Sequence, residues 1–209
     1  MEILSIQTGK AEKTSAKAGL TGHFKKPIAG KAFVGTSGLL GDTICDLENH
    51  GGVDQAVYLF GEPDLLWWGA ELDRDIQSGF FGENLVISDL ETSKLVIGDI
   101  LRMGDVILQI TSPRTPCATY AAHIGNGRAI KQIYAAERPG AYARVLKEGH
   151  VTKGVPVVVN PYEGEQITIV ENMRAYLERF DDPEFLERAL AVPAHYKLHA
   201  LAQERLGLT

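Results

Sequence analysis

The sequence predicts a mainly β domain followed by a small domain of three helices, and three observations support this expectation. The chain has 209 residues, enough for one domain with a sizeable core and a small appendage. Short apolar runs separated by glycines fill the N-terminal half, as in strands joined by turns. From about residue 163 the pattern becomes that of short helices. We therefore expect a β domain over residues 1–162 and a helical domain over residues 163–209.

The composition excludes several classes of protein. A net charge of −6 argues against a broad nucleic-acid-binding face and against a polybasic membrane patch. The only cysteines, Cys45 and Cys117, lack the Cys-x-x-Cys spacing of a zinc ribbon or redox pair. No secretory segment opens the sequence, and no apolar run is long enough to span a bilayer. We expect a reduced, cytoplasmic protein that binds neither nucleic acid nor membrane.

The first strands follow from apolar runs. Residues 1–6 and 31–35 form two of them, and residues 56–60 form a third. Residues 63–72 predict a helix in which Trp67 and Trp68 pack against the core.

Three stretches of this half carry candidate binding residues. Lys25 lies in a loop with a second lysine beside it, an arrangement that is usually only a solvated edge. The pair Gly51-Gly52 permits close approach of backbone N–H groups to a ligand, and His50 and Asp54 flank this pair. The alternative to a binding role is a simple turn in which the aspartate is a cap.

The third stretch is a glycine turn that carries Glu83 and Asn84 and opens a strand. One amide both donates and accepts hydrogen bonds, so Asn84 is a candidate contact to a heterocycle. Alternatively, asparagine is there because it tolerates left-handed geometry.

The segment that ends at Cys117 carries the most informative pattern of the sequence. Two Gly-Asp turns bracket residues 100–103 as a hairpin that feeds a strand over residues 106–110. Pro113 and Pro116 then stop the strand, because each lacks an N–H and holds the preceding residue in extended geometry. The strand therefore leads into a stiff loop that begins at Ser112.

A short helix follows this loop, with Thr115 as its predicted N-cap and Pro116 at its first position. Cys117 would lie in the first turn, where Arg114 and the helix dipole favour thiolate over thiol. The alternative is that Cys117 is a small buried hydrophobe. Cys45 has no such neighbours and is expected to be passive.

The remaining elements follow from local signals. Residues 129–138 predict a helix, and residues 141–146 and 155–159 predict strands. Thr168 and Glu171 fit a capping box, and Asp182 with Pro183 fits an N-cap and a first helical position. The three C-terminal helices are expected near residues 172–180, 185–191 and 194–206, the last ended by Gly207.

Five motifs in a fixed order resemble the MOSC family, named for the C-terminal domain of molybdenum cofactor sulfurases. They are Gly22-x-Phe24-Lys25-x-Pro27, Gly41-Asp42 leading to His50-Gly51-Gly52-x-Asp54-x-Ala56-Val57-Tyr58, Phe81-Gly82-Glu83-Asn84-Leu85, Gly98-Asp99 and Pro113-Arg114-x-Pro116-Cys117. The helical tail resembles that of bacterial stand-alone members that reduce hydroxylaminopurine. The chain departs from the family pattern at Ile44 and Cys45.

This resemblance implies a mostly antiparallel β-barrel that binds molybdenum cofactor, a pterin dithiolene with a phosphate, and it also allows pyridoxal phosphate. Cys117 would be the metal ligand and the catalytic residue. The candidate cofactor-binding residues are Arg114, His50, Gly51, Gly52, Asp54, Asn84, Glu83, Lys25 and Ser112.

Two functions are compatible with these residues. One is a molybdenum-dependent reductase of N-hydroxylated bases and related compounds, in which the cofactor carries the two-electron chemistry. The sequence has no dinucleotide-binding motif and no cysteine cluster, so such an enzyme would need a separate electron-donor reductase as partner. The other is a carrier that holds sulfur as a persulfide on Cys117 or delivers the cofactor. The oligomeric state is left open, with a homodimer as one option.

Overall fold

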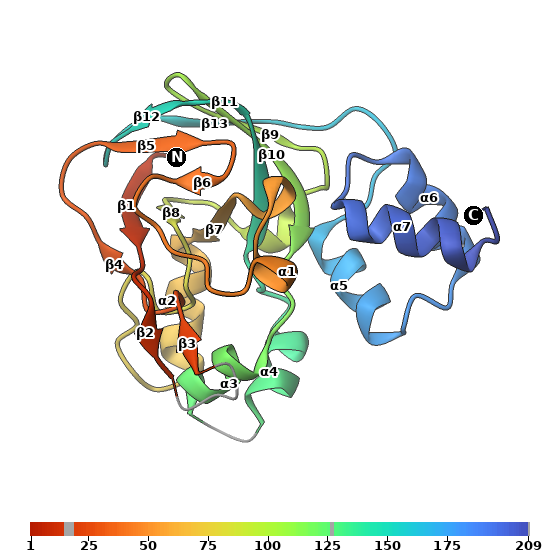
Figure 1. Cartoon of the computed structure of the whole chain (residues 1–209), viewed down its shortest axis with the longest axis horizontal. Helices are drawn as coiled ribbons and strands as arrows, with labels where there is room; N and C mark the ends of the chain where they lie inside the picture. Colours follow the sequence, from red (N-terminus) through yellow and green to blue (C-terminus); the bar gives the residue numbers. More distant parts are fainter. Residues whose placement is uncertain (15–18, 126–127, 209) are drawn as a thin grey trace.

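A mixed eight-stranded sheet forms the centre of the molecule in a computed structural model that describes residues 1–14, 19–125 and 128–208 (Figure 1). The strand order is β13-β9-β10-β11-β7-β8-β1-β4. The strands are β1 (Ile3–Thr8), β4 (Lys26–Pro27), β7 (Val57–Gly61), β8 (Leu85–Ile87), β9 (Ile100–Met103), β10 (Val106–Pro113), β11 (Ala141–Lys147) and β13 (Val157–Asn160). Two small sheets accompany it, β12-β5-β6 (Gly149–Val151, Ala32–Gly35, Gly38–Leu39) and β2-β3 (Glu12–Lys13, Leu20–Thr21).

The expected closed antiparallel barrel is wrong, because the sheet ends at β13 on one side and at β4 on the other. Where β1 approaches the residues before β13, Glu2 and Pro156 form only an isolated bridge. The Ile3 N–H donates to the Val155 carbonyl at 3.0 Å and the Val157 N–H donates to the Met1 carbonyl at 3.1 Å, so the two edges meet only over this short stretch, without a regular strand pairing. A bulge in β1 between Ile3 and Ser5 also interrupts the register on its other side, against β8.

The fold is also mixed α/β and not mainly β. Strands β7 and β8 pair in parallel, which requires a crossover, and helix α2 (Glu62–Glu71) lies in that connection. The other helical segments of this part are α1 (Leu47–His50), η1 (Val53–Gln55), η2 (Thr92–Lys94), α3 (Ala118–Ile124) and α4 (Ala129–Ala136).

Strand β7 separates two apolar cores. All five of its residues are buried, and alternate side chains point to opposite faces of the sheet. Val57 and Leu59 belong to a large aliphatic core, whereas Tyr58 and Phe60 belong to an aromatic core with Trp68. Trp68 is fully buried, which confirms its predicted role in packing.

Three C-terminal helices lie together beside the sheet, with α5 next to β10 (Figure 1). They are α5 (Ile169–Leu177), α6 (Pro183–Ala191) and α7 (Tyr196–Arg205). Two predicted caps are confirmed, since Thr168 accepts from the Glu171 N–H at 3.0 Å and Asp182 accepts from the Glu184 N–H at 3.0 Å. The helices contribute to the same aliphatic core as the sheet. A domain boundary at residue 162 stays a prediction.

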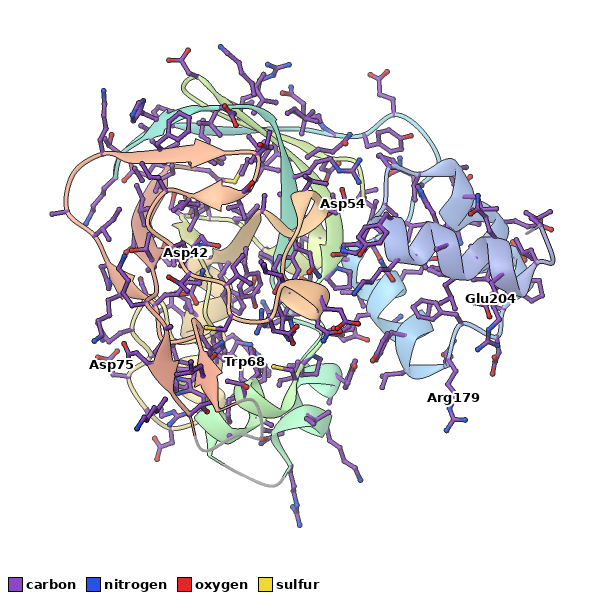
Figure 2. All side chains as sticks on the ribbon, in the orientation of Figure 1. Asp42, Asp54, Trp68, Asp75, Arg179 and Glu204 are labelled. Carbon is purple, nitrogen blue, oxygen red and sulfur yellow. The ribbon has the colours of Figure 1, made fainter. Side chains whose placement is uncertain are left out.

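Asp54 connects the sheet to these helices. One carboxylate oxygen pairs with Arg144 of β11 at 3.0 Å, and the other accepts from the Tyr196 N–H at 2.8 Å. Figure 2 shows Asp54 at the side of the sheet that faces the helices. No helix of the described residues is long and apolar enough to cross a membrane.

Candidate functional site

A pocket of about 230 Å³ opens beside the end of β10, and Cys117 lies in its wall. Segments far apart in the sequence form it: residues 20–25, 43–46 and the end of α1, together with β7, the start of β8 and the start of α3. Its lining includes five of the predicted site residues: Lys25, His50, Asn84, Arg114 and Cys117. The fold therefore gathers these five from four separate motifs.

Cys117 is the N-cap of α3, which begins at Ala118, and this corrects the predicted start of the helix at Pro116. The backbone of Cys117 is extended, with φ −113° and ψ 173°. Thr115 precedes a proline and therefore disfavours helical geometry, and the extended Cys117 keeps Pro116 outside the helix as well, so the helix begins only after Cys117. Strand β10 in turn runs to Pro113, farther than predicted.

The Cys117 thiol is acidic. Burial raises its pKa, but interaction with the His50 imidazole, the Arg114 charge and the Tyr120 backbone N–H outweigh burial and lower the pKa to about 6. Arg114 had been expected to act in this way, whereas His50 comes from the end of α1, more than sixty residues earlier. At neutral pH the sulfur is therefore mainly thiolate, a soft anionic ligand and a nucleophile.

Arg114 is a buried cation enclosed by aromatic rings. Its guanidinium carbon lies 5.1 Å from the ring centroid of Tyr58, 5.4 Å from that of Tyr120 and 5.9 Å from that of Tyr142. It donates a hydrogen bond from Nη1 to the Tyr142 hydroxyl. Its buried Nε has no partner among the described residues. A buried cation with a spare donor is a suitable site for an anionic ligand.

Lys25 and Asn84 are held by Asp42, which had been noted only as part of the Gly41-Asp42 pair that leads to the His50 motif. Asp42 pairs with the ammonium of Lys25 and accepts from the Asn84 amide nitrogen at 2.8 Å and from the Gly9 N–H at 2.7 Å. The Asn84 side chain also accepts from the Tyr58 N–H at 3.1 Å and donates to the Gln7 carbonyl at 3.3 Å. Asn84 has negative φ, so left-handed geometry is not the reason for it.

These contacts divide the predicted lining residues into two groups. Lys25 and Asn84 already have partners, and the lysine charge is balanced by Asp42, so both stabilise the wall of the pocket. Arg114, His50 and Cys117 form the part of the wall that is available to an anionic or electrophilic ligand.

The other predicted site residues lie outside the pocket lining. Glu83 accepts from the Gly79 N–H and from the Phe81 N–H at 3.0 Å, and burial, partly offset by these hydrogen bonds, raises its pKa to about 7. Gly51 is the C-cap of α1, directly after His50, and Gly52 is the N-cap of η1. Asp54 binds the C-terminal helices, as described above, and Ser112 is buried on β10 with no partner for its hydroxyl among the described residues.

The structure adds pocket residues that the sequence did not indicate. Cys45 lies in the lining together with its neighbours Thr43, Ile44 and Asp46, although it had been expected to be a passive residue and the segment departs from the family pattern. Tyr58 and Tyr142 also line the pocket, and so does His23, which occupies the variable position of the Gly22-x-Phe24-Lys25 motif. Only the closeness of His23 to that motif could have indicated it.

Comparison with known proteins gives a consistent result. Residues 46–158 match the MOSC domain. The chain is 32% identical over 154 residues to YflK of Bacillus subtilis, an uncharacterized protein, and the match covers 73% of this chain and 70% of YflK. It is 31% identical over 167 residues to a protein of Gibberella moniliformis named "Reductase", but this match covers 77% of the chain and only 30% of that protein.

The fold resembles that of a solved structure over nearly its whole length. YiiM from Geobacillus stearothermophilus superposes with a TM-score of 0.81 at 26% identity, and the superposition covers 98% of both chains. The similarity therefore includes the three C-terminal helices as well as the sheet.

Proposed function

The chain belongs to the MOSC domain family, and from this premise we propose that it is a molybdenum-cofactor-dependent reductase of N-hydroxylated bases and related compounds. In this proposal Cys117 is the protein ligand of the metal. The observation that supports this proposal most directly is the acidic Cys117 thiol in a pocket that is also lined by Arg114, a buried cation with a hydrogen-bond donor that has no partner among the described residues.

The residues of the pocket fit such a cofactor. A molybdenum ion favours a soft anionic ligand, and a thiol with a pKa of about 6 is such a ligand at neutral pH. The cofactor phosphate favours a guanidinium group, and the buried Nε of Arg114 lacks a partner among the residues described. Both groups therefore have the chemistry that the cofactor requires.

The side chains of the pocket would have different roles toward the cofactor. Cys117 binds the metal, and Arg114 with His50 orients the anionic part of the cofactor. Tyr58 and Tyr142 exclude water from that side of the pocket and thereby strengthen its electrostatic interactions. Lys25 and Asn84, fixed by Asp42, keep the wall in place. When bound, the cofactor supplies two-electron reduction.

The name "Reductase" of the Gibberella protein supports a redox function for the shared part of the two chains. The sequence has no motif for a nicotinamide or flavin dinucleotide, so electrons would come from a separate partner protein. The acidic thiol of Cys117 is equally compatible with a persulfide or cofactor carrier, and the assay must separate these two functions.

The test is reduction of an N-hydroxylated purine by the molybdenum-loaded protein, with a reduced viologen dye as electron donor. We expect conversion to the parent purine that depends on the protein and is lost in Cys117→Ser. Full molybdenum loading without turnover of N-hydroxylated purines or related N-hydroxylated compounds would contradict the reductase and favour the carrier.

A further inference from the structure

His23 lies in the pocket wall with an unsatisfied ring nitrogen. Its side chain is only 8% exposed, and its buried Nε2 has no hydrogen-bond partner among the described residues. A buried polar atom without a partner destabilises the folded protein, because it has lost its hydrogen bond to water. Because His23 lines the pocket, this nitrogen is a candidate contact to a ligand there.

The ring of His23 is fixed from several sides. The ring centroids of Phe24, Tyr120 and His123 lie 6.0, 5.8 and 5.3 Å from its own. On a further side lies Gly82, where an added Cβ would come within 2.5 Å of the His23 Nδ1. Because its neighbours leave the imidazole little room to turn, Nε2 is held in one direction before a ligand binds.

The imidazole is neutral at physiological pH. Burial lowers its pKa well below 6.5, and the charges of Arg114, His123, Lys25 and His50 lower it further. A neutral imidazole offers one donor and one acceptor and no charge. An anion is better bound by Arg114, so His23 suits the neutral polar edge of a ligand.

We propose that His23 hydrogen-bonds through Nε2 to a fused nitrogen heterocycle in this pocket and so contributes to ligand specificity. The proposal rests on the function proposed above, which supplies two ligands with this chemistry, the pterin of the cofactor and the purine of the substrate. Both have a flat ring whose edge alternates donors and acceptors. The rings of Phe24 and Tyr120 beside His23 give the site the apolar surroundings that strengthen such a hydrogen bond.

The test is calorimetric titration of the purified full chain with two probes, 6-carboxypterin and N-hydroxyadenine. Titration of wild type, His23→Phe and His23→Gln separates the ring from its hydrogen bond, because Phe keeps a ring of similar size and Gln restores a donor and an acceptor. We expect the Kd to rise about tenfold in His23→Phe and to recover by more than half of that factor in His23→Gln. A change with only one probe identifies that heterocycle as the ligand of His23.

His195→Asn is the matched control. His195 is as buried as His23 but lies outside the pocket lining, where its Nδ1 accepts from the Lys197 N–H at 3.0 Å and caps α7. Asparagine is a good N-cap, so the fold should survive, and the Kd should stay within twofold of wild type. If His23→Phe does not fold, His23→Leu gives the same comparison.

Equal Kd values in wild type and His23→Phe for both probes would overturn the proposal. A wild-type chain that binds neither probe would also overturn it. The function proposed above fails on a different result, namely a purified protein that binds a heterocycle but retains no molybdenum. The two failures are therefore distinguishable.

Discussion

At the scale of single residues, the state of the Cys117 sulfur depends on side chains from two distant parts of the chain. Burial works against ionisation, and His50 from the end of α1 and Arg114 from the end of β10 overcome it. Both side chains act strongly on the sulfur because electrostatic interactions are strong where water is excluded.

The first prediction concerns this ionisation. In a Cys45→Ser background, the rate of alkylation by iodoacetamide should reach half its maximum near pH 6, as expected for a thiol with a pKa of about 6. His50→Ala should move the midpoint upward, because it removes the largest contribution that lowers the pKa. A midpoint near pH 9 in the parent protein would contradict this description of the site.

The same shift makes folding stability depend on pH. The folded pKa of Cys117 lies below its ordinary value of 9.0, so ionisation stabilises the folded state as pH rises from about 6 to about 9. That contribution is lost as pH falls through 6. The difference in unfolding free energy between wild type and Cys117→Ser should follow this direction in urea titrations.

The second prediction concerns Arg114. Arg114→Lys keeps the charge but loses the planar fork and the Nε donor, so affinity for the cofactor should fall about tenfold. Pterin released per chain measures this loss. Arg138→Lys is the control, because Arg138 pairs with Asp64 at 2.6 Å and lies outside the pocket lining. Equal pterin in Arg114→Lys and wild type would exclude Arg114 as the anion-binding group.

Contacts between residues that are close in sequence could be predicted from the sequence. Arg114 and Cys117 are three residues apart, and their association could be predicted from the intervening prolines. The partners of Lys25 and Asn84 could not, because Asp42 lies 17 and 42 residues away and looks like an ordinary turn residue. The family motifs marked these positions but could not say that their side chains contact each other through Asp42.

At the scale of elements, Asp42 joins the segments that form one wall of the pocket. Its carboxylate binds the loop after β1 through Gly9, the start of β4 through Lys25 and the start of β8 through Asn84. The Lys25 and Asp42 side chains are 8% and 6% exposed. The pocket wall therefore depends on a buried ion pair and not on a regular strand ladder.

The third prediction follows from this arrangement. Asp42→Ala leaves the Lys25 charge buried and should lower the unfolding free energy by about 3–5 kcal/mol, measured by urea denaturation. Adding Lys25→Met should recover part of the loss, because no unpaired charge then remains. Asp105→Ala, which breaks an exposed pair with Lys147, should cost about 1 kcal/mol or less. Similar losses for Asp42→Ala and Asp105→Ala would contradict the assigned role.

Elements with strong local signals could be predicted from the sequence. The hairpin of β9 and β10, helix α2 and the caps of α5 and α6 all have such signals. Strand β12 and the two-residue strands β2, β3, β4 and β6 were missed, because a strand this short is defined by its pairing partner and not by its own pattern.

At the scale of the whole molecule, the sheet and the C-terminal helices share one aliphatic core, and the surface carries a net negative charge. The unclosed sheet could not be predicted, because the short contact between residues 1–3 and residues 155–157 joins the two ends of the chain's sheet and has no local sequence signal. The closed barrel had been inferred from the family resemblance alone.

The fourth prediction concerns the electron donor. NADH or NADPH alone should not support reduction of an N-hydroxylated purine, whereas a reduced viologen dye should. Association with a basic partner reductase should weaken as salt screens the charges of the acidic surface. Efficient turnover with NADPH and no second protein would refute the two-component scheme.

The most direct test of the central claim is the molybdenum and pterin content of the protein purified from cells that make the cofactor. Wild type and Cys45→Ser should retain molybdenum and pterin in equal amounts, because the Cys45 thiol is not the metal ligand. Cys117→Ser should lose the metal while the chain remains folded. Retention of molybdenum in Cys117→Ser, or an equal loss in both variants, would contradict the assignment of Cys117 as the ligand.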